Sequence, residues 1–203
     1  MRVPRSRSAV PAGAALESDE AASGRDIPDL VRFMLATGVR IGEALAVCWP
    51  EVDCEAGLVS VNFTVVRVKG EGLVRKSTKS SSGERTLPLP SWAVEMLRRR
   101  ENERGDREEP VFPDSLGGLR DPSNTRRDLR KARGAEEFSW VTSHVFRKTA
   151  ATILDEAGLS ARVVADQLGH ARPSLTQDVY MGRKAVTEDA ATALETVFDS
   201  ESE

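Results

Sequence analysis

The strongest constraint on the fold is the stretch of residues 58–68, in which most side chains are β-branched or aromatic and partly alternate with polar ones. This pattern is typical of a β-strand and differs from the helical spacing found elsewhere in the chain. Turn sequences rich in glycine or serine follow at 70–72 and 80–84, and each leads into a short strand-like segment, 73–75 and 85–89. We therefore expect a small three-stranded antiparallel sheet.

Apolar residues recur at helical spacing before and after this sheet. Glycines follow several of these segments, at positions where a helix commonly ends in the left-handed conformation. Ser143 and Ser160 precede two of them and are suited to cap a helix N-terminus. The fold class that we predict is α+β, mainly α-helical. The expected helices cover 28–35, 41–47, a segment from 91 onward, 121–133, 144–156, 161–168, 173–180 and 187–198.

The organisation along the chain predicts one folded unit with a segment at either end. Residues 1–26 are rich in Ala, Ser, Pro, Gly and charge without apolar periodicity, which favours a flexible N-terminal arm or linker. Residues 27–184 then form the main domain, and 185–203 a C-terminal helix with an acidic tail. The apolar stripe of that last helix comprises Val186, Ala190, Ala191, Leu194, Val197 and Phe198.

Composition excludes several classes of protein. A chain of 203 residues can bury one sizeable core, and its 39% apolar and 30% charged residues are ordinary for a globular domain. It has no apolar run near the ~18 residues of a membrane span, and its N-terminus lacks the apolar stretch of a secretory signal. Cys48 and Cys54 are too few for a zinc site or a disulfide framework. We expect a cytoplasmic protein with reduced thiols.

The charge distribution favours an anionic partner more than the net charge of −3 suggests. Six acidic residues follow Lys184, and without them the remainder would carry +3. The segment 126–133 holds five positive charges and one negative. Such a run is either a solvated helix face or a local surface for phosphate contact.

One tyrosine and two histidines point to a particular chemistry. Tyr180 is the only tyrosine, and both histidines, His144 and His170, lie within the 36 residues before it. Arg147 lies three positions after His144, so in a helix the two share a face and can reach one phosphate. Tyrosine and histidine suit a covalent phosphoryl exchange without a metal. Taken singly, the histidine and arginine also fit a surface or capping pair, and Tyr180 a half-buried tyrosine.

Five segments together resemble the catalytic domain of the tyrosine recombinases, or phage-type integrases, in the order of that family's motifs. The resemblance extends over residues 28–184 and implies the fold of the DNA breaking-rejoining enzymes. The segments are Ala36-Thr-Gly-Val-Arg40-Ile-Gly-Glu43-Ala-Leu45, Thr78-Lys79-Ser-Ser-Ser-Gly-Glu-Arg85-Thr-Leu-Pro-Leu89, Ser143-His144-Val-Phe-Arg147-Lys-Thr-Ala150, Leu168-Gly169-His170 and Tyr180.

The resemblance implies a role for each matching residue. Arg40 and Arg147 would bind the non-bridging oxygens of a scissile phosphate and stabilise its transition state. His144 and His170 would hydrogen-bond the phosphate or the attacking hydroxyl, and one would act as general base, because an unperturbed tyrosine has a pKa of about 10. Tyr180 would attack phosphorus and hold the 3′ end as a phosphotyrosine ester.

A lysine on the hairpin would protonate the leaving 5′-oxygen, again by resemblance. Lys79 matches the family spacing best, Lys76 is the second candidate, and Lys69 is also available. A hairpin lysine alone is more commonly a solvated edge charge. Glu43 matches a family glutamate that orients groups beside Arg40 and is not expected to be catalytic.

The function expected from these features is site-specific recombination of double-stranded DNA, with no cofactor, metal, small-molecule substrate or membrane. Full-length members of the family usually carry a core-binding domain ahead of the catalytic one, so we expect an isolated catalytic domain, a fragment or an unusually short member here. The last helix would pack on its own core or dock on a neighbour, giving a monomer alone and a homotetramer on DNA. Two alternatives are a type IB topoisomerase-like enzyme and a non-catalytic DNA-binding module of the same fold.

Overall fold

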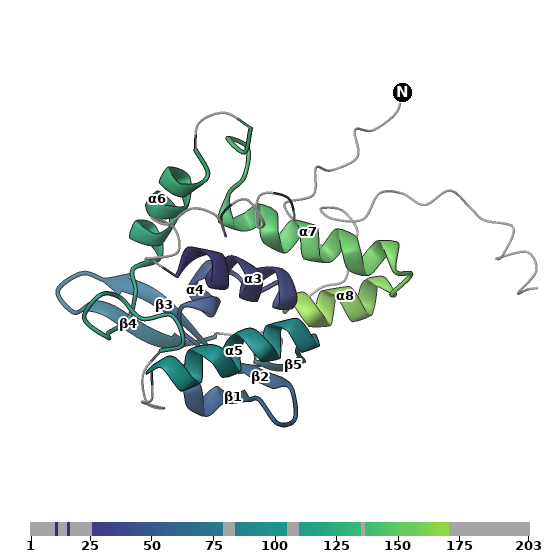
Figure 1. The fold of residues 1–203 in the computed structure, drawn as a ribbon, viewed down its shortest axis with the longest axis horizontal. Helices are drawn as coiled ribbons and strands as arrows, with labels where there is room; N and C mark the ends of the chain where they lie inside the picture. Colours follow the sequence, from purple (N-terminus) through teal and green to yellow (C-terminus); the bar gives the residue numbers. More distant parts are fainter. Residues whose placement is uncertain are drawn as a thin grey trace, which may run out of the picture.

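The structure is a computed structural model that describes residues 26–78, 84–104, 110–134 and 137–170, together with Pro11 and Leu16. Helix α3 lies centrally, with α7 and α8 along one side and the strands and α5 on the other (Figure 1). The elements are α3 (Ile27–Thr37), α4 (Ile41–Ala44), the 3₁₀ turn η1 (Trp49–Glu51), β1 (Val52–Asp53), β2 (Leu58–Val61), β3 (Phe63–Val68), β4 (Gly72–Ser77), β5 (Arg85–Pro88), α5 (Ser91–Arg104), α6 (Pro122–Ala132), α7 (Ser143–Glu156) and α8 (Ala161–Leu168).

The expected α+β class is confirmed, with helices predominating and small antiparallel sheets. The strand connections differ from the expected sheet. The run 58–68 is two strands separated at Asn62, whose carbonyl accepts a hydrogen bond from the Thr78 amide over 3.0 Å. The second half pairs with β4 as a two-stranded sheet, and the first half pairs with β1 on one edge and β5 on the other.

Pairing lengths explain this arrangement. Strand β4 reaches only from Val68↔Gly72 to Phe63↔Ser77, so it leaves the backbone of β2 without a partner. Strand β5 takes that edge in antiparallel register, with Val59 opposite Leu87 and Val61 opposite Arg85. Backbone groups in a sheet need partners, and the short strand β1 supplies them on the opposite edge of β2.

Ser160 caps α8 as predicted, whereas Ser143 is the first residue of α7, and the N-cap Thr142 makes no side-chain cap hydrogen bond. The carboxylate of Asp121 accepts from the Ser123 amide over 2.6 Å at the start of α6, and the Ser160 hydroxyl accepts from the Val163 amide over 3.3 Å at the start of α8. Gly169 ends α8 in the left-handed conformation. The helices predicted at 173–180 and 187–198 lie outside the described residues.

The core is formed mainly by side chains of α3, of α4 and the chain after it to Trp49, and of β2 and α5, with Phe146 from α7. Phe33 and Phe112 meet within it, with ring centroids 5.4 Å apart. Leu16 also belongs to this cluster and is only 2% exposed. The segment 1–26, expected to be a flexible arm, thus contributes an apolar side chain to the core, where it gains free energy by leaving water.

Two further observations concern cysteines and membranes. Cys48 and Cys54 are both free thiols, each partly buried. Among the described helices, none combines the length and the apolar character needed to cross a bilayer.

Candidate active site

A sharp turn between α3 and α4 presents Arg40. Gly38 ends α3 with φ of 69°, and its amide donates to the Met34 carbonyl over 2.9 Å. A Cβ atom at this position would lie 2.7 Å from Cδ2 of Leu168, so both the backbone conformation and the close approach of α8 require glycine. Arg40 follows in extended conformation as the N-cap of α4.

Glu43 fixes Arg40 through main chain and side chain together. Its Oε2 atom accepts the Arg40 amide hydrogen over 2.9 Å, and its Oε1 atom accepts from Nη1 of Arg40 over 2.8 Å. Burial raises the pKa of this carboxyl, but the nearby Arg85 and the hydrogen bond from Arg40 outweigh it, and the net pKa is lowered. Glu43 is thus an anion that orients Arg40, which is the role that the family resemblance implied for it.

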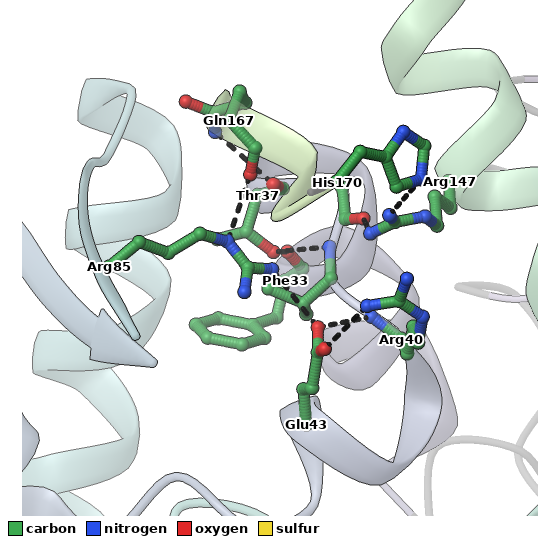
Figure 2. Close-up of polar contacts among 10 residues, drawn as sticks. Phe33, Thr37, Arg40, Glu43, Arg85, Arg147, Gln167 and His170 are labelled. Carbon is green, nitrogen blue, oxygen red and sulfur yellow. Dashed lines mark hydrogen bonds and ion pairs between the residues drawn. The ribbon is translucent and has the colours of Figure 1, made fainter. Parts of the chain in front are cut away.

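Arg147 is the largest fully buried side chain among the described residues, at 1% exposure. It projects from the first half of α7, where Nη1 donates to the Gly38 carbonyl over 2.7 Å. Its Nη2 atom lies 2.6 Å from Nε2 of His170 (Figure 2). Arginine can only donate, so Nε2 of His170 accepts and the ring carries its proton on Nδ1.

His170 is held in this neutral form by its surroundings. Burial, followed by the positive charges of Arg147, Arg40 and Arg85, lowers the pKa of His170 to about 4, against a smaller opposing effect of Glu43. The amide of His170 donates to the Ala165 carbonyl over 2.9 Å, which completes the end of α8 and fixes the backbone from which the ring projects.

His144 lies at the exposed start of α7, one turn before Arg147. Its pKa is lowered by desolvation and by the charges of Arg147, Arg40 and Lys148. Both histidines are therefore neutral near pH 7, and both lie in the field of the same two arginines.

The chemical character of this cluster suits an oxyanion ligand. The side chain of Arg40 is 52% exposed, so its guanidinium is open to solvent. The guanidinium of Arg147 is buried and is held by the Gly38 carbonyl. Guanidinium groups match the geometry of phosphate and carboxylate oxygens. In the described part of the chain, no three His, Cys, Asp or Glu side chains gather as metal ligands.

The sequence profile of the phage integrase family matches residues 15–185. This chain belongs to the phage integrase family. The matched region begins inside the segment 1–26, which agrees with the burial of Leu16.

Curated relatives of this phage integrase family member include recombinases from bacteria and a phage. A tyrosine recombinase XerC-like protein of Caldanaerobacter subterraneus subsp. tengcongensis is 28% identical over 203 residues, covering 89% of this chain and 51% of the relative. Tyrosine recombinase XerC of Xylella fastidiosa is 30% identical, covering 80% and 54%. An integrase of Staphylococcus phage L54a is 27% identical, covering 74% and 46%. The chain thus spans about half the length of the curated relatives that it matches.

Solved structures of integrases and recombinases share the fold. The Tn1549 transposon integrase in complex with a circular intermediate DNA aligns with a TM-score of 0.75 at 20% identity, over 92% of this chain and 63% of that one. XerA recombinase aligns with a TM-score of 0.63 at 25% identity, over 97% and 64%.

Four of the six predicted site residues come together in the structure of this integrase-family chain: Arg40, His144, Arg147 and His170. Lys79 and Tyr180 lie outside the described residues. Among the alternatives to Lys79, the side chain of Lys76 is exposed on β4 opposite Thr64, and Lys69 is exposed in the turn after β3.

Sequence reasoning assigned no role to Arg85 or Gln167, which lie directly behind the cluster. Arg85 is buried, with its side chain 7% exposed; Nη2 is 3.0 Å from Oε2 of Glu43, and Nε donates to the Gln167 carbonyl over 3.0 Å. The side-chain amide of Gln167, through Nε2, in turn donates to the Thr37 carbonyl over 3.1 Å (Figure 2). The alternation of side chains along β5 could have indicated that Arg85 points inward, because it lies on the same face of the strand as the buried Leu87.

Proposed function

We propose that this chain is the catalytic domain of a site-specific DNA recombinase that cleaves and rejoins strands through a 3′-phosphotyrosine bond. The observation that carries the proposal is the pairing of Arg147 with a neutral His170 beside the exposed Arg40. This is an anion site with an imidazole N–H donor at its edge, in a chain of the phage integrase family. Relatives that are named recombinases and integrases support the same activity.

The reaction follows from the charges of these groups. Arg40 and Arg147 bind the two non-bridging oxygens, and their charge is most favourable when the phosphate becomes five-coordinate. Tyr180 Oη forms a bond to phosphorus as its proton passes to a neutral histidine, and the bond from phosphorus to the 5′-oxygen breaks. Lys79 gives that oxygen a proton. Attack by another 5′-hydroxyl reverses these steps and joins a new strand.

Helix α6 is the proposed surface for the DNA backbone. Its exposed residues include Arg126, Arg127, Arg130 and Lys131. Cations on one helix face add phosphate contacts without requiring a particular base sequence, and each contact increases the salt dependence of binding. The partner that this surface favours is double-stranded DNA, and binding by this domain alone should weaken steeply as salt increases.

A covalent capture experiment tests the chemistry. The full chain is incubated with a pool of nicked duplexes of random sequence, and complexes that resist SDS are isolated and sequenced. The wild type should yield adducts with a shared sequence, and Tyr180→Phe should yield none. Adducts formed by Tyr180→Phe would contradict the proposal. Relaxation of supercoiled plasmid by the monomer at no preferred site would favour the topoisomerase-like alternative.

An apolar cavity of about 1120 Å³ supports assembly into a homotetramer on DNA. It lies between α3, α5, α7 and α8, where Trp92, Ile153 and Val163 are about half exposed. Large apolar side chains exposed together mark a docking surface more often than a free one.

The occupant that we assign to this cavity is segment 187–198 of a neighbouring copy. The apolar stripe of the C-terminal segment, from Val186 to Phe198, is complementary to the apolar lining of the cavity. Deletion of 186–203 should leave a folded monomer that binds DNA without forming the tetramer, as measured by light scattering of the DNA complex. Unfolding of the deletion variant would show that the segment packs on its own core.

A further inference from the structure

Arg85 connects α4 and α8 through its side chain but has no direct role in the proposed reaction. It is the first residue of β5, opposite Val61. Its side chain is 7% exposed, and its guanidinium points toward Glu43 and Gln167 (Figure 2). A buried guanidinium requires compensating partners, and here the partners come from two other elements.

One partner leads to Arg40. Nη2 of Arg85 contacts Oε2 of Glu43 over 3.0 Å, and the same oxygen accepts the Arg40 amide hydrogen. The second carboxylate oxygen accepts from the Arg40 guanidinium. Arg85 therefore holds the carboxylate that sets both the backbone and the side chain of Arg40.

The other partner leads to His170. Nε of Arg85 donates to the Gln167 carbonyl over 3.0 Å, within the last turn of α8. The Gln167 side chain ties the same turn to Thr37 at the end of α3. His170 follows three residues later, and its backbone is fixed by the bond from its amide to Ala165.

The two contacts require the planar fork of an arginine. Nε and Nη2 lie on one edge of a rigid group, so the distance between the Glu43 oxygen and the Gln167 carbonyl is fixed by covalent geometry. A lysine at this position keeps the charge but has one point of contact, so it can satisfy one partner while the other moves.

We propose that Arg85 is a positioning residue, which sets the separation between Arg40 and His170. This inference rests on the proposed recombinase function. It goes beyond that function in assigning the alignment of these two groups to one buried side chain that does not touch the phosphate.

The first test separates positioning from DNA binding. Arg85→Lys should retain the DNA dissociation constant within about threefold, since a buried side chain makes no phosphate contact. The rate constant for adduct formation at saturating DNA should fall by about 100-fold, as expected for a misalignment near 1 Å. Arg100→Lys is the matched control, because Arg100 is also buried and bridges carboxylates and a carbonyl, those of Asp26, Asp29 and Val111. Its cleavage rate constant should stay within about threefold of wild type.

The second test does not depend on activity. The chain has only two histidines, so nitrogen-15 NMR of the imidazole rings gives two resolvable sets of signals. In the wild type and in Arg100→Lys, His170 should be the single tautomer with its proton on Nδ1. In Arg85→Lys, the signals should move toward the average of both tautomers as the bond to Arg147 loosens.

The outcomes distinguish the inference from the function on which it rests. An unchanged tautomer together with wild-type cleavage in Arg85→Lys overturns the positioning role. Equal losses in Arg85→Lys and Arg100→Lys also overturn it, because they would reflect general destabilisation. Absence of any adduct in the wild type, with the tautomer shift still present in Arg85→Lys, overturns the proposed recombinase chemistry and leaves the structural coupling in place.

Discussion

Arg147 and His170 form a donor–acceptor pair in which the arginine Nη2 lies 2.6 Å from the histidine Nε2. Arg147 lies on α7 and His170 follows the end of α8, and the contact fixes the protonation of the histidine as well as its position. With its Nε2 lone pair taken up by Arg147 and its proton on Nδ1, the His170 ring is suited to donate a hydrogen bond to an oxyanion.

The first prediction concerns pH and stability. The pKa of His170 is lowered from 6.5 to about 4 in the folded chain. Between these two pH values the unfolded chain therefore binds a proton at this residue, and the folded chain does not. The stabilising contribution is complete above the unfolded pKa of about 6.5 and is lost as the pH falls toward the folded pKa. Urea denaturation of the wild type should therefore show falling stability from pH 6.5 to pH 4.5, and His170→Gln should show a flatter profile. A profile equally steep in both proteins would contradict the assignment.

A second prediction concerns the glycine between α3 and α4. Gly38→Ala should lower the free energy of unfolding by about 2–4 kcal/mol, because it combines left-handed strain with overlap against Leu168. Gly158→Ala is the matched control, since Gly158 has φ of 81° but no atom within 4 Å of the added Cβ. It should cost only the strain, about 1 kcal/mol. Similar losses in both variants, measured by urea denaturation, would show that the close approach of α8 is unimportant.

Helix ends and strand pairing show what a single sequence can and cannot predict. Gly38, Asp121, Ser160 and Gly169 act on their immediate neighbours, so local rules located the helix ends that they determine. The strand pairing was mispredicted because residues 58–68 have one continuous pattern, and only the length of β4 reveals the division at Asn62.

Long-range partners were beyond the reach of such rules. Arg85 contacts residues 42 and 82 positions away, so its role depends on the tertiary arrangement of α4 and α8. The same holds for Leu16, whose burial depends on the core and is not apparent from the sequence around it. The motif residues were easier to identify, because Arg40, His144, Arg147 and His170 each belong to a short segment typical of the family.

A third prediction identifies the general acid. Lys79→Ala should slow cleavage of ordinary DNA, and a 5′-thio leaving group should restore the rate, because a thiolate departs without protonation. Lys76→Ala is the control and should be close to wild type on both substrates. Single-turnover cleavage rates give the comparison. Rescue of Lys76→Ala in place of Lys79→Ala would transfer the role to the exposed lysine of β4.

The fourth prediction concerns the basic face of α6. Arg126→Gln and Arg130→Gln should each reduce the slope of log K against log salt by about 1, as expected when one phosphate contact is lost. Arg98→Gln is the control, because Arg98 lies on α5 and donates to the Cys54 carbonyl. It should leave the slope unchanged. Fluorescence anisotropy with labelled duplex across a salt series measures each slope, and an equal change in Arg98→Gln would indicate a diffuse electrostatic effect.

The bond from Arg147 to the Gly38 carbonyl has a consequence for mutagenesis. Its acceptor is a peptide oxygen, and every residue type presents that oxygen, so scanning with the natural amino acids leaves this half of the contact intact. Semisynthesis offers direct access. An ester linkage between residues 38 and 39 would make the carbonyl a poorer acceptor while leaving all side chains unchanged, and the resulting loss in cleavage would report how firmly the buried guanidinium must be held.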